Sequence, residues 1–204
     1  MQPFTEFTAV AVPLAMTNVN TDMLIPARFL RKPRDEHYGQ YLFHDLRHGM
    51  DGRLRDSFVL NETVYEQAKI LVACANFGCG SSRESAVYVL LDSGFRCVIA
   101  PSFGDIFFGN CLQNGVLPVV LAEAECAELL AWLEANPGAS VTADLQAQTV
   151  STADGKVRSF TLDPVRRERM LKGLDEIGLT LTRLPAIEAF EQRHAQAQPW
   201  LARG

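Results

Sequence analysis

Three short apolar runs, each followed by a segment with a helical pattern, dominate the middle of the chain. The runs KILVAC, FRCVIAP and VLPVVL cover residues 69–74, 95–101 and 116–121. Continuous apolar runs of this length predict strands that are buried on both faces of a sheet. The segments that follow the runs predict three helices: one from Ser81 or Ser82 to Gly94, one over 102–115 and one over 122–138. This alternation implies parallel strands with right-handed crossovers.

The first part of the chain has a different pattern. Residues 7–16 are apolar and rich in β-forming residues but are interrupted by Pro13, which predicts one early strand or two. From Arg28 to Arg55 the composition becomes basic, with three of the four histidines, Pro33 and several glycines. A segment of this kind inside a compact domain is usually a functional or mobile loop, so we expect a mobile loop at about 28–55.

The last part of the chain predicts a small antiparallel addition to the sheet. Residues 140–150 and 156–162 are expected to form two strands joined by a turn at 153–155. A helix should begin at Asp163-Pro164, and a surface helix should cover residues 185–198. We therefore predict a single α/β domain over residues 1–204, with a mixed sheet whose central strands are parallel.

Composition excludes several classes of function. The chain has 204 residues, 48% of them hydrophobic and 21% charged, with a net charge of −5. This balance is typical of a globular protein and argues against nucleic acid or an anionic membrane as partner. No apolar run reaches the length of a bilayer, and the N-terminal residues lack the basic start of a signal peptide. We expect a cytoplasmic protein, in which a local basic pocket could still bind a small anion.

The five cysteines do not predict a disulfide or a metal site. They stand at positions 74, 79, 97, 111 and 126, and no two have the Cys-x-x-Cys spacing. Structural disulfides are improbable in a reducing compartment, and neither zinc nor iron–sulfur ligation is supported by the spacing. The four histidines are scattered as well. We expect no metal on this chain.

The segment NFGCGSSRE, residues 76–84, carries the candidate chemistry. Gly78 and Gly80 follow a buried strand and allow a ligand to approach the main chain closely. A helix that starts at Ser81 or Ser82 would direct free N–H groups at a carboxylate or phosphate, and Arg83 would add a planar fork for a carboxylate. However, Ser81-x-x-Glu84 is also a capping box, which begins many helices without any function. The segment lacks the P-loop ending and the dinucleotide-binding pattern.

As a string, this segment strongly resembles the NFGCGSSRE signature of the isopropylmalate isomerase (3-isopropylmalate dehydratase) small subunits, and more distantly the swivelling domain of aconitase. The resemblance extends over most of the chain in the right order. It includes Asn20-Thr21-Asp22 with Ile25-Pro26, Phe29-Leu30, Tyr41-Leu42-Phe43, VIAPSF at 98–103, Asp105-Ile106-Phe107, Asn110, Asn114-Gly115, Leu117-Pro118, Gly173-Leu174-Asp175 and Ile177-Gly178-Leu179-Thr180.

The resemblance implies a fold, a reaction and a partner. The fold would be the swivelling β/β/α domain, and the reaction would be dehydration and rehydration that converts 2-isopropylmalate to 3-isopropylmalate in leucine biosynthesis. The [4Fe-4S] cluster would be held by three cysteines of a separate large subunit, so this chain alone would be inactive. Ser81, as an alkoxide, would remove the substrate proton, Ser82 would assist binding, and Arg83 would stabilise the alkoxide and bind a carboxylate.

The resemblance also implies a substrate loop, which places further contacts in the basic segment. We expect Gly80 to bind substrate through its main chain and Arg34 to contact a substrate carboxylate, with Arg31 and Lys32 behind it. Leu30 or Tyr38 would supply an apolar surface for the isopropyl group. A charge run is more often only a solvated face, which is the plain alternative for the arginines.

The chain departs from the family pattern at a few positions, which keeps other functions open. Ser85 replaces the usual histidine of SSREHA, Asn20 replaces an aspartate, and the Thr-Arg-x-Gly pattern of the substrate loop is not cleanly present. The first alternative is a paralogous hydro-lyase for citraconate, citramalate, dimethylmalate or homoaconitate. The second is a non-catalytic module that holds an anion at the glycine-rich loop.

Overall fold

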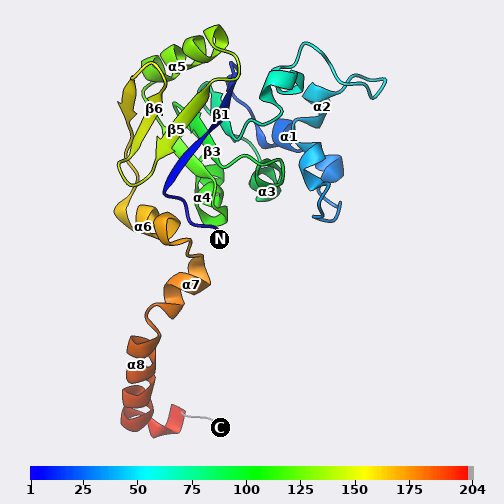
Figure 1. Cartoon of the computed structure of the whole chain (residues 1–204). Coiled ribbons are helices and arrows are strands. Elements are labelled where there is room, and N and C mark those ends of the chain that lie inside the picture. Colours follow the sequence, from blue (N-terminus) through cyan, green and yellow to red (C-terminus); the bar gives the residue numbers. More distant parts are fainter. Residues whose placement is uncertain (202–204) are drawn as a thin grey trace.

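A seven-stranded sheet forms the centre of the computed structural model, which describes residues 1–201 (Figure 1). The strands lie in the order β4-β3-β2-β1-β5-β6-β7. Their bounds are β1 Glu6–Leu14, β2 Ile70–Ala73, β3 Cys97–Ala100, β4 Leu117–Val120, β5 Ser140–Asp144, β6 Thr149–Thr152 and β7 Val157–Ser159. Neighbours from β1 to β4 pair in parallel, and those from β1 through β5 to β7 pair antiparallel. The predicted α/β fold with a mixed sheet is confirmed, and its parallel strands form one half of the sheet.

Strand β1 joins the two halves and continues through Pro13. Its first residues, Glu6–Val10, pair with β5, and its last, Ala11–Leu14, pair with β2. The N–H of Ala11 donates to the carbonyl of Ala139 at 3.1 Å, so Pro13, two residues on, has its missing donor on the same side. Because β5 starts opposite Val10, no strand stands there to require that donor, and the proline is tolerated.

Eight helices accompany the sheet within the described residues, together with five short 3₁₀ turns. The helices are α1 Thr21–Leu24, α2 His44–Arg47, α3 Ser85–Asp92, α4 Asp105–Asn114, α5 Glu123–Ala135, α6 Pro164–Lys172, α7 Glu176–Leu181 and α8 Leu184–Ala197. The 3₁₀ turns are η1 Ala27–Phe29, η2 Tyr38–Tyr41, η3 Val59–Asn61, η4 Thr63–Tyr65 and η5 Pro199–Leu201. No helix within residues 1–201 combines the length and apolar character needed to cross a membrane.

Local signals placed most helix ends correctly. The side chain of Asp163 accepts hydrogen bonds from the N–H groups of Val165 and Arg166, both at 3.1 Å, and starts α6 as predicted. Gly115 has a φ of 87° and ends α4. The prediction of one strand over 140–150 was wrong, because the chain turns back between β5 and β6. That turn contains no glycine or proline, and Gln148 adopts its left-handed φ of 56°.

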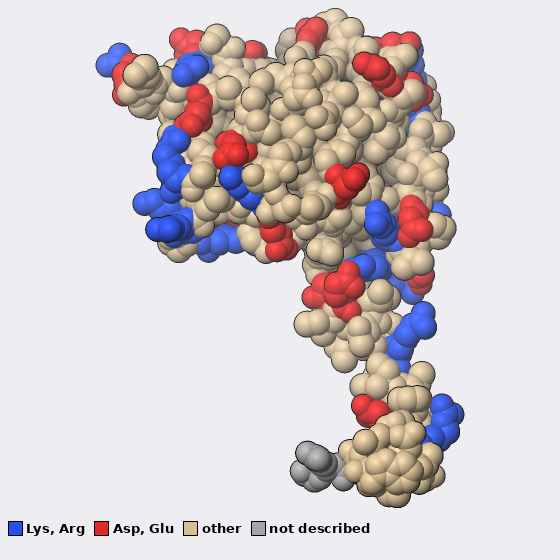
Figure 2. Space-filling model, turned by 180° about the vertical axis from the view of Figure 1, so that it is seen from behind, with Lys and Arg blue, Asp and Glu red and all other residues tan. Residues whose placement is uncertain are grey.

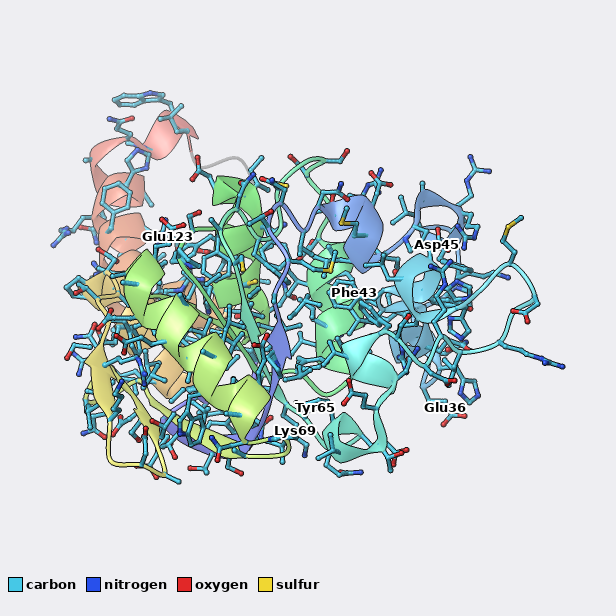
Figure 3. The ribbon with its side chains drawn as sticks, turned by 90° about the horizontal axis from the view of Figure 1, so that it is seen from above. Glu36, Phe43, Asp45, Tyr65, Lys69 and Glu123 are labelled. Carbon is cyan, nitrogen blue, oxygen red and sulfur yellow. The ribbon has the colours of Figure 1, made fainter. Side chains whose placement is uncertain are left out.

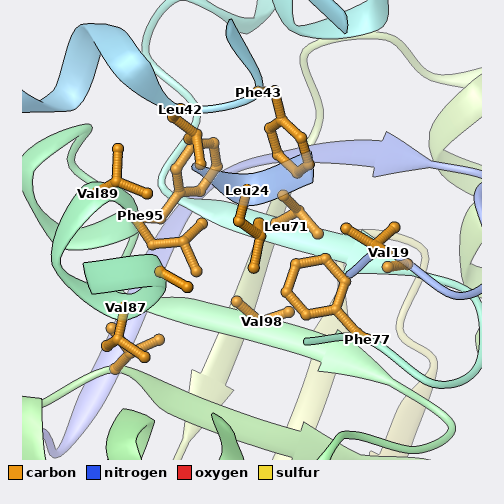
Figure 4. Packing of buried hydrophobic residues seen from close by; sticks show 14 of the residues in the cluster. Val19, Leu24, Leu42, Phe43, Leu71, Phe77, Val87, Val89, Phe95 and Val98 are labelled. Carbon is orange, nitrogen blue, oxygen red and sulfur yellow. The ribbon is translucent and has the colours of Figure 1, made fainter. Parts of the chain in front are cut away.

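Two hydrophobic cores lie on the two faces of the sheet. One includes Leu71 and Val98 from the strands, and α1, α3 and part of the 28–55 segment cover it (Figure 4). The other includes Ile70 and Ile99 with residues of β5 and β6, and α5 packs against β1, β2 and β3 on this face. Successive strand residues therefore point to opposite cores, as expected for strands that are buried on both faces.

The 28–55 segment is partly built into the first core. Tyr38, Leu42 and Phe43 are 3%, 1% and 0% exposed, and Phe43 holds a left-handed φ of 51°. Figure 3 shows Phe43 toward the sheet and both Glu36 and Asp45 on the outer side. The prediction of a mobile loop can therefore concern only the exposed stretches around 30–37 and 50–55, where it stays a prediction.

Replacing Phe43 by alanine should loosen this anchor. The change empties a fully buried ring site, so we expect the free energy of unfolding to fall by about 3–5 kcal/mol. Met50 in the same segment is fully exposed, and Met50→Ala should change stability by less than about 0.5 kcal/mol. Urea denaturation of both variants measures the difference. Equal midpoints for the two variants would contradict the anchoring role.

Candidate active site

The loop after β2 is fixed to the loops that follow β1 and β3. The N–H of Gly78 donates to the carbonyl of Val19 at 2.7 Å, and the N–H of Phe77 donates to the carbonyl of Ser102 at 3.0 Å. Phe77 is fully buried, and its ring packs edge-on against Phe107 with centroids 5.5 Å apart. The segments that follow the three parallel strands therefore meet at the carboxyl ends of these strands, hereafter the carboxyl edge of the sheet. Open α/β sheets bind ligands at this edge.

Glycines allow these segments to touch. Gly78 has a φ of 71°, and a Cβ on it would lie 2.2 Å from the ring of Phe107. Gly104, just before α4, has an ordinary φ, but its Cβ would lie 2.6 Å from the carbonyl oxygen of Gly78. The sequence pattern predicted that Gly78 allows a ligand to approach. In the structure Gly78 instead lets the loop pack against α4.

The predicted catalytic residues line an open cavity of about 230 Å³ at this edge. The cavity is bounded by residues 78–83 and by Gly104–Phe107 at the start of α4. Ser81 and Ser82 are exposed, and the Arg83 side chain is 19% exposed. The structure thus brings Gly80, Ser81, Ser82 and Arg83 together in front of solvent.

Helix α1 holds this loop from the other side. The buried hydroxyl of Thr21 donates to the carbonyl of Ser81 at 3.0 Å, and the N–H of Thr21 donates to the carbonyl of Cys79 at 2.9 Å. The next residue, Asp22, forms an ion pair with the guanidinium of Arg83. The main chain of Ser81 is therefore positioned by contacts to a residue sixty positions earlier.

The prediction that a helix begins at Ser81 or Ser82 was wrong. Helix α3 begins at Ser85, and the capping box is not formed, since Glu84 accepts instead from the side chain of Asn114 at 2.9 Å. The contacts from Thr21 hold residues 81–83 out of the helix. The helix that reaches the cavity with its first turn is α4, and the free N–H groups of that turn give this wall a positive partial charge.

Comparisons with known proteins identify the family of this chain. The model of the aconitase C-terminal domain family matches residues 1–124, and that of the C-terminal domain of the 3-isopropylmalate dehydratase small subunit matches residues 176–204. A third model, LeuD_N, matches residues 127–164. The 3-isopropylmalate dehydratase small subunit of Roseobacter denitrificans is 48% identical over 98% of this chain and 100% of its own length. That of Paramagnetospirillum magneticum is 49% identical with the same coverage.

The chain belongs to the family of 3-isopropylmalate dehydratase small subunits. A solved structure of 3-isopropylmalate dehydratase from Methanocaldococcus jannaschii has a similar fold, with a TM-score of 0.64 over 91% of this chain and 99% of that chain. Its sequence identity of 24% supports the fold alone. The family resemblance and the swivelling α/β fold expected from the sequence are confirmed.

Two acidic residues of the site were not among the predicted site residues. Asp22 appeared only as part of the family resemblance, and Asp105, which lines the cavity, was given no role. Both follow a parallel strand, after β1 and β3 respectively. The rule that the carboxyl ends of neighbouring parallel strands meet could have placed them beside Ser81.

The predicted substrate-loop residues do not line this cavity. Leu30 is 37% exposed and Arg31 is exposed, but neither is among the residues that bound the space beside Ser81. Arg34 grips Asp92 with two hydrogen bonds of 2.7 and 2.8 Å, and its guanidinium lies 4.2 Å from the ring centre of Tyr88. Asp92 is the last residue of α3, so Arg34 lies at the end of that helix away from Ser81.

The cysteines of this chain do not fit a resident iron–sulfur cluster. All five are free, and residues 1–201 contain no group of three or more cysteine, histidine or acidic side chains placed to hold a metal. Burial raises the pKa of the Cys97 and Cys111 thiols and raises the pKa of Cys126 to about 11. Without a metal, these three thiols stay protonated at neutral pH.

A methyl group at position 104 tests the close packing of the site. Gly104→Ala should push the carbonyl of Gly78 and displace the loop that carries Ser81 and Ser82. We expect this to lower the free energy of unfolding by about 1–3 kcal/mol. Gly109 lies within α4 with open space around its Cβ position, so Gly109→Ala should stabilise by about 0.5–1 kcal/mol. Chemical denaturation measures the change in the free energy of unfolding, which should be negative for Gly104→Ala and positive for Gly109→Ala. A Gly104→Ala variant as stable as wild type would show that the contact at Gly104 does not matter.

Proposed function

We propose that this chain is the small subunit of a 3-isopropylmalate dehydratase and supplies the proton-transferring part of an active site completed by a larger subunit. The observation that carries the proposal is the exposed cluster of Ser81, Ser82 and Arg83 at the ligand-binding edge of the sheet. The names of the full-length relatives support this substrate over citraconate, citramalate, dimethylmalate or homoaconitate. We place the reaction in the cytoplasm, as a step of leucine biosynthesis.

The proposed reaction is an elimination of water followed by its return in the opposite orientation. Ser81, as an alkoxide, takes the proton from the carbon next to the hydroxyl-bearing carbon of 2-isopropylmalate. The carbon–oxygen bond breaks, a double bond forms, and the hydroxyl group leaves as hydroxide with the electron pair of that bond. Hydroxide then adds to the neighbouring carbon while Ser81 returns its proton to the carbon that carried the hydroxyl, which gives 3-isopropylmalate and restores the alkoxide. The [4Fe-4S] cluster, which we assign to the large subunit, supplies Lewis-acid chemistry toward the substrate hydroxyl and a carboxylate.

The charges on this chain meet only part of what a serine alkoxide needs. An unperturbed serine is too weak an acid to ionise at neutral pH, so positive charge must surround it. The first turn of α4 and Arg83 supply some, but Asp22 pairs with Arg83 and Asp105 lines the same cavity. We infer that a substrate carboxylate competes with Asp22 for Arg83, and that the large subunit adds further positive charge.

The remaining contacts are assigned by position. Gly80, exposed and with a φ of 92°, offers its main chain to the substrate, and Ser82 its hydroxyl. In the 28–55 segment we propose Leu30 as the apolar contact and Arg31 as the carboxylate contact. Arg34 is the carboxylate contact expected from the sequence, but it is held in an ion pair with Asp92, so we propose Arg31 in its place.

Loss of the Ser81 hydroxyl tests the proposed base. The chain is co-expressed with the large subunit from the same source and assayed anaerobically with 2-isopropylmalate. Ser81→Ala should lower kcat by about 10²–10⁴-fold, the usual range for a general base, with little change in KM. Ser159, exposed on β7, provides a matched control, and Ser159→Ala should keep full activity. If Ser81→Ala retains kcat within threefold, the loop is only a binding module.

The two arginines of the 28–55 segment give a second test. Arg31→Gln should raise KM about tenfold, because a charge-assisted hydrogen bond to a carboxylate is lost. Arg34→Gln should leave KM within about twofold and lower stability by at most about 1 kcal/mol, since its ion pair is partly solvated. Steady-state kinetics and thermal melting separate these effects. The reverse order of KM values would mean that Arg34 leaves Asp92 for the substrate.

A further inference from the structure

The C-terminal residues 174–201, hereafter the arm, project from the domain (Figure 1). The arm consists of α7, α8 and the turn η5, none of which contains a buried residue. Both hydrophobic cores end earlier along the chain, the last fully buried member being Met170 in α6. The domain therefore does not need the arm to complete its core.

The arm nevertheless exposes large apolar side chains. They are Ile177 (71% exposed), Leu181 (57%), Leu184 (43%), Phe190 (59%), Trp200 (73%) and Leu201 (56%). Figure 2 shows the end of the arm as mostly uncharged surface in that view. Large apolar side chains gathered in exposed positions on one projecting segment indicate an interaction site. A helix of 14 residues is also marginally stable in water without a partner, so α8 needs a surface to pack against.

The pattern of family matches indicates which partner covers the arm. The match to the aconitase C-terminal domain ends at residue 124. A C-terminal domain is covalently linked to the preceding domains of its own chain, so it needs no separate docking segment. The match over the arm, residues 176–204, is to a family specific to separate small subunits. Relatives align over 201 residues, a span that has to include the arm. A separate chain loses the high effective concentration of a covalent link and needs contact area to replace it.

We propose that the arm docks through its apolar side chains onto the large subunit and acts as the non-covalent tether between the two chains. A typical stable interface buries about 800 Å² on each partner, and six large apolar groups, two of them aromatic, supply a substantial part of it. This proposal rests on the proposed function, because it takes the large subunit as the partner.

The base of the arm and the loop that carries Ser81 lie at opposite ends of the parallel strands. The carbonyl of Gly173, the residue just before the arm, accepts a hydrogen bond from the N-terminal amino group of Met1 at 3.1 Å, close to the start of β1. Ser81 lies beyond the end of β2, which runs parallel to β1. Changes in the arm should therefore alter binding of the large subunit without altering the chemistry.

The test uses the full chain with Phe190→Gln and Trp200→Gln combined. Calorimetry or biolayer interferometry with the large subunit should show a Kd at least tenfold higher than wild type, while kcat at saturating large subunit stays within twofold. Val157, 63% exposed on β7, provides the matched control, and Val157→Gln should leave the Kd unchanged. Thermal melting of the isolated chain should not move, because neither arm residue reaches a core.

Two results would overturn the proposal. One is a Kd within twofold of wild type in the double variant. The other is a wild-type chain that dimerises by light scattering through the arm, which would assign the arm to a second copy. Ser81→Ala separates this proposal from the proposed function, since it should abolish turnover and keep the Kd. An inactive wild-type pair with an arm-dependent Kd would refute the function and leave the tether standing.

Discussion

The parallel pairing of β1, β2 and β3 is the constraint on which the site depends. It places three following segments at one edge, and main-chain hydrogen bonds join them there: Thr21 to Cys79 at 2.9 Å and Phe77 to Ser102 at 3.0 Å. Residues that are distant in sequence thereby come to face one cavity. Without this pairing, Ser81 would stand on an unsupported glycine-rich loop, and neither Asp22 nor α4 would be near it.

The charges around Ser81 nearly cancel, so this chain by itself forms only part of an active site. Arg83 is paired with Asp22, and Asp105 faces the same space, so acidic groups offset the cation and the start of α4. A dianionic substrate would meet little net attraction from this chain alone. The cavity is also open, and both serines are exposed to water. A second surface that excludes water and brings positive charge would complete it.

Much of the fold could be predicted, because its signals are local. The apolar runs at 69–74, 95–101 and 116–121 became β2, β3 and β4, and Asp163-Pro164 starts α6. The failures have tertiary causes. Ser81 looked like a helix cap, but its carbonyl is held by Thr21. Arg34 looked like a free cation, but its partner Asp92 is 58 positions away, and no local pattern reveals such a pairing. The loop residues NFGCGSSRE were recognisable by resemblance, whereas the geometry that makes them useful was not.

The double pairing of β1 has a consequence for synthesis on the ribosome. This strand is made before both of its partners, Ile70–Ala73 and Ser140–Asp144. At roughly 5–20 residues per second, β1 waits on the order of ten seconds before β5 emerges. During that interval at least one side of an apolar strand is unpaired, which favours association with other nascent chains. Such a topology requires non-local contacts and therefore folds slowly, so we expect the nascent chain to need chaperones.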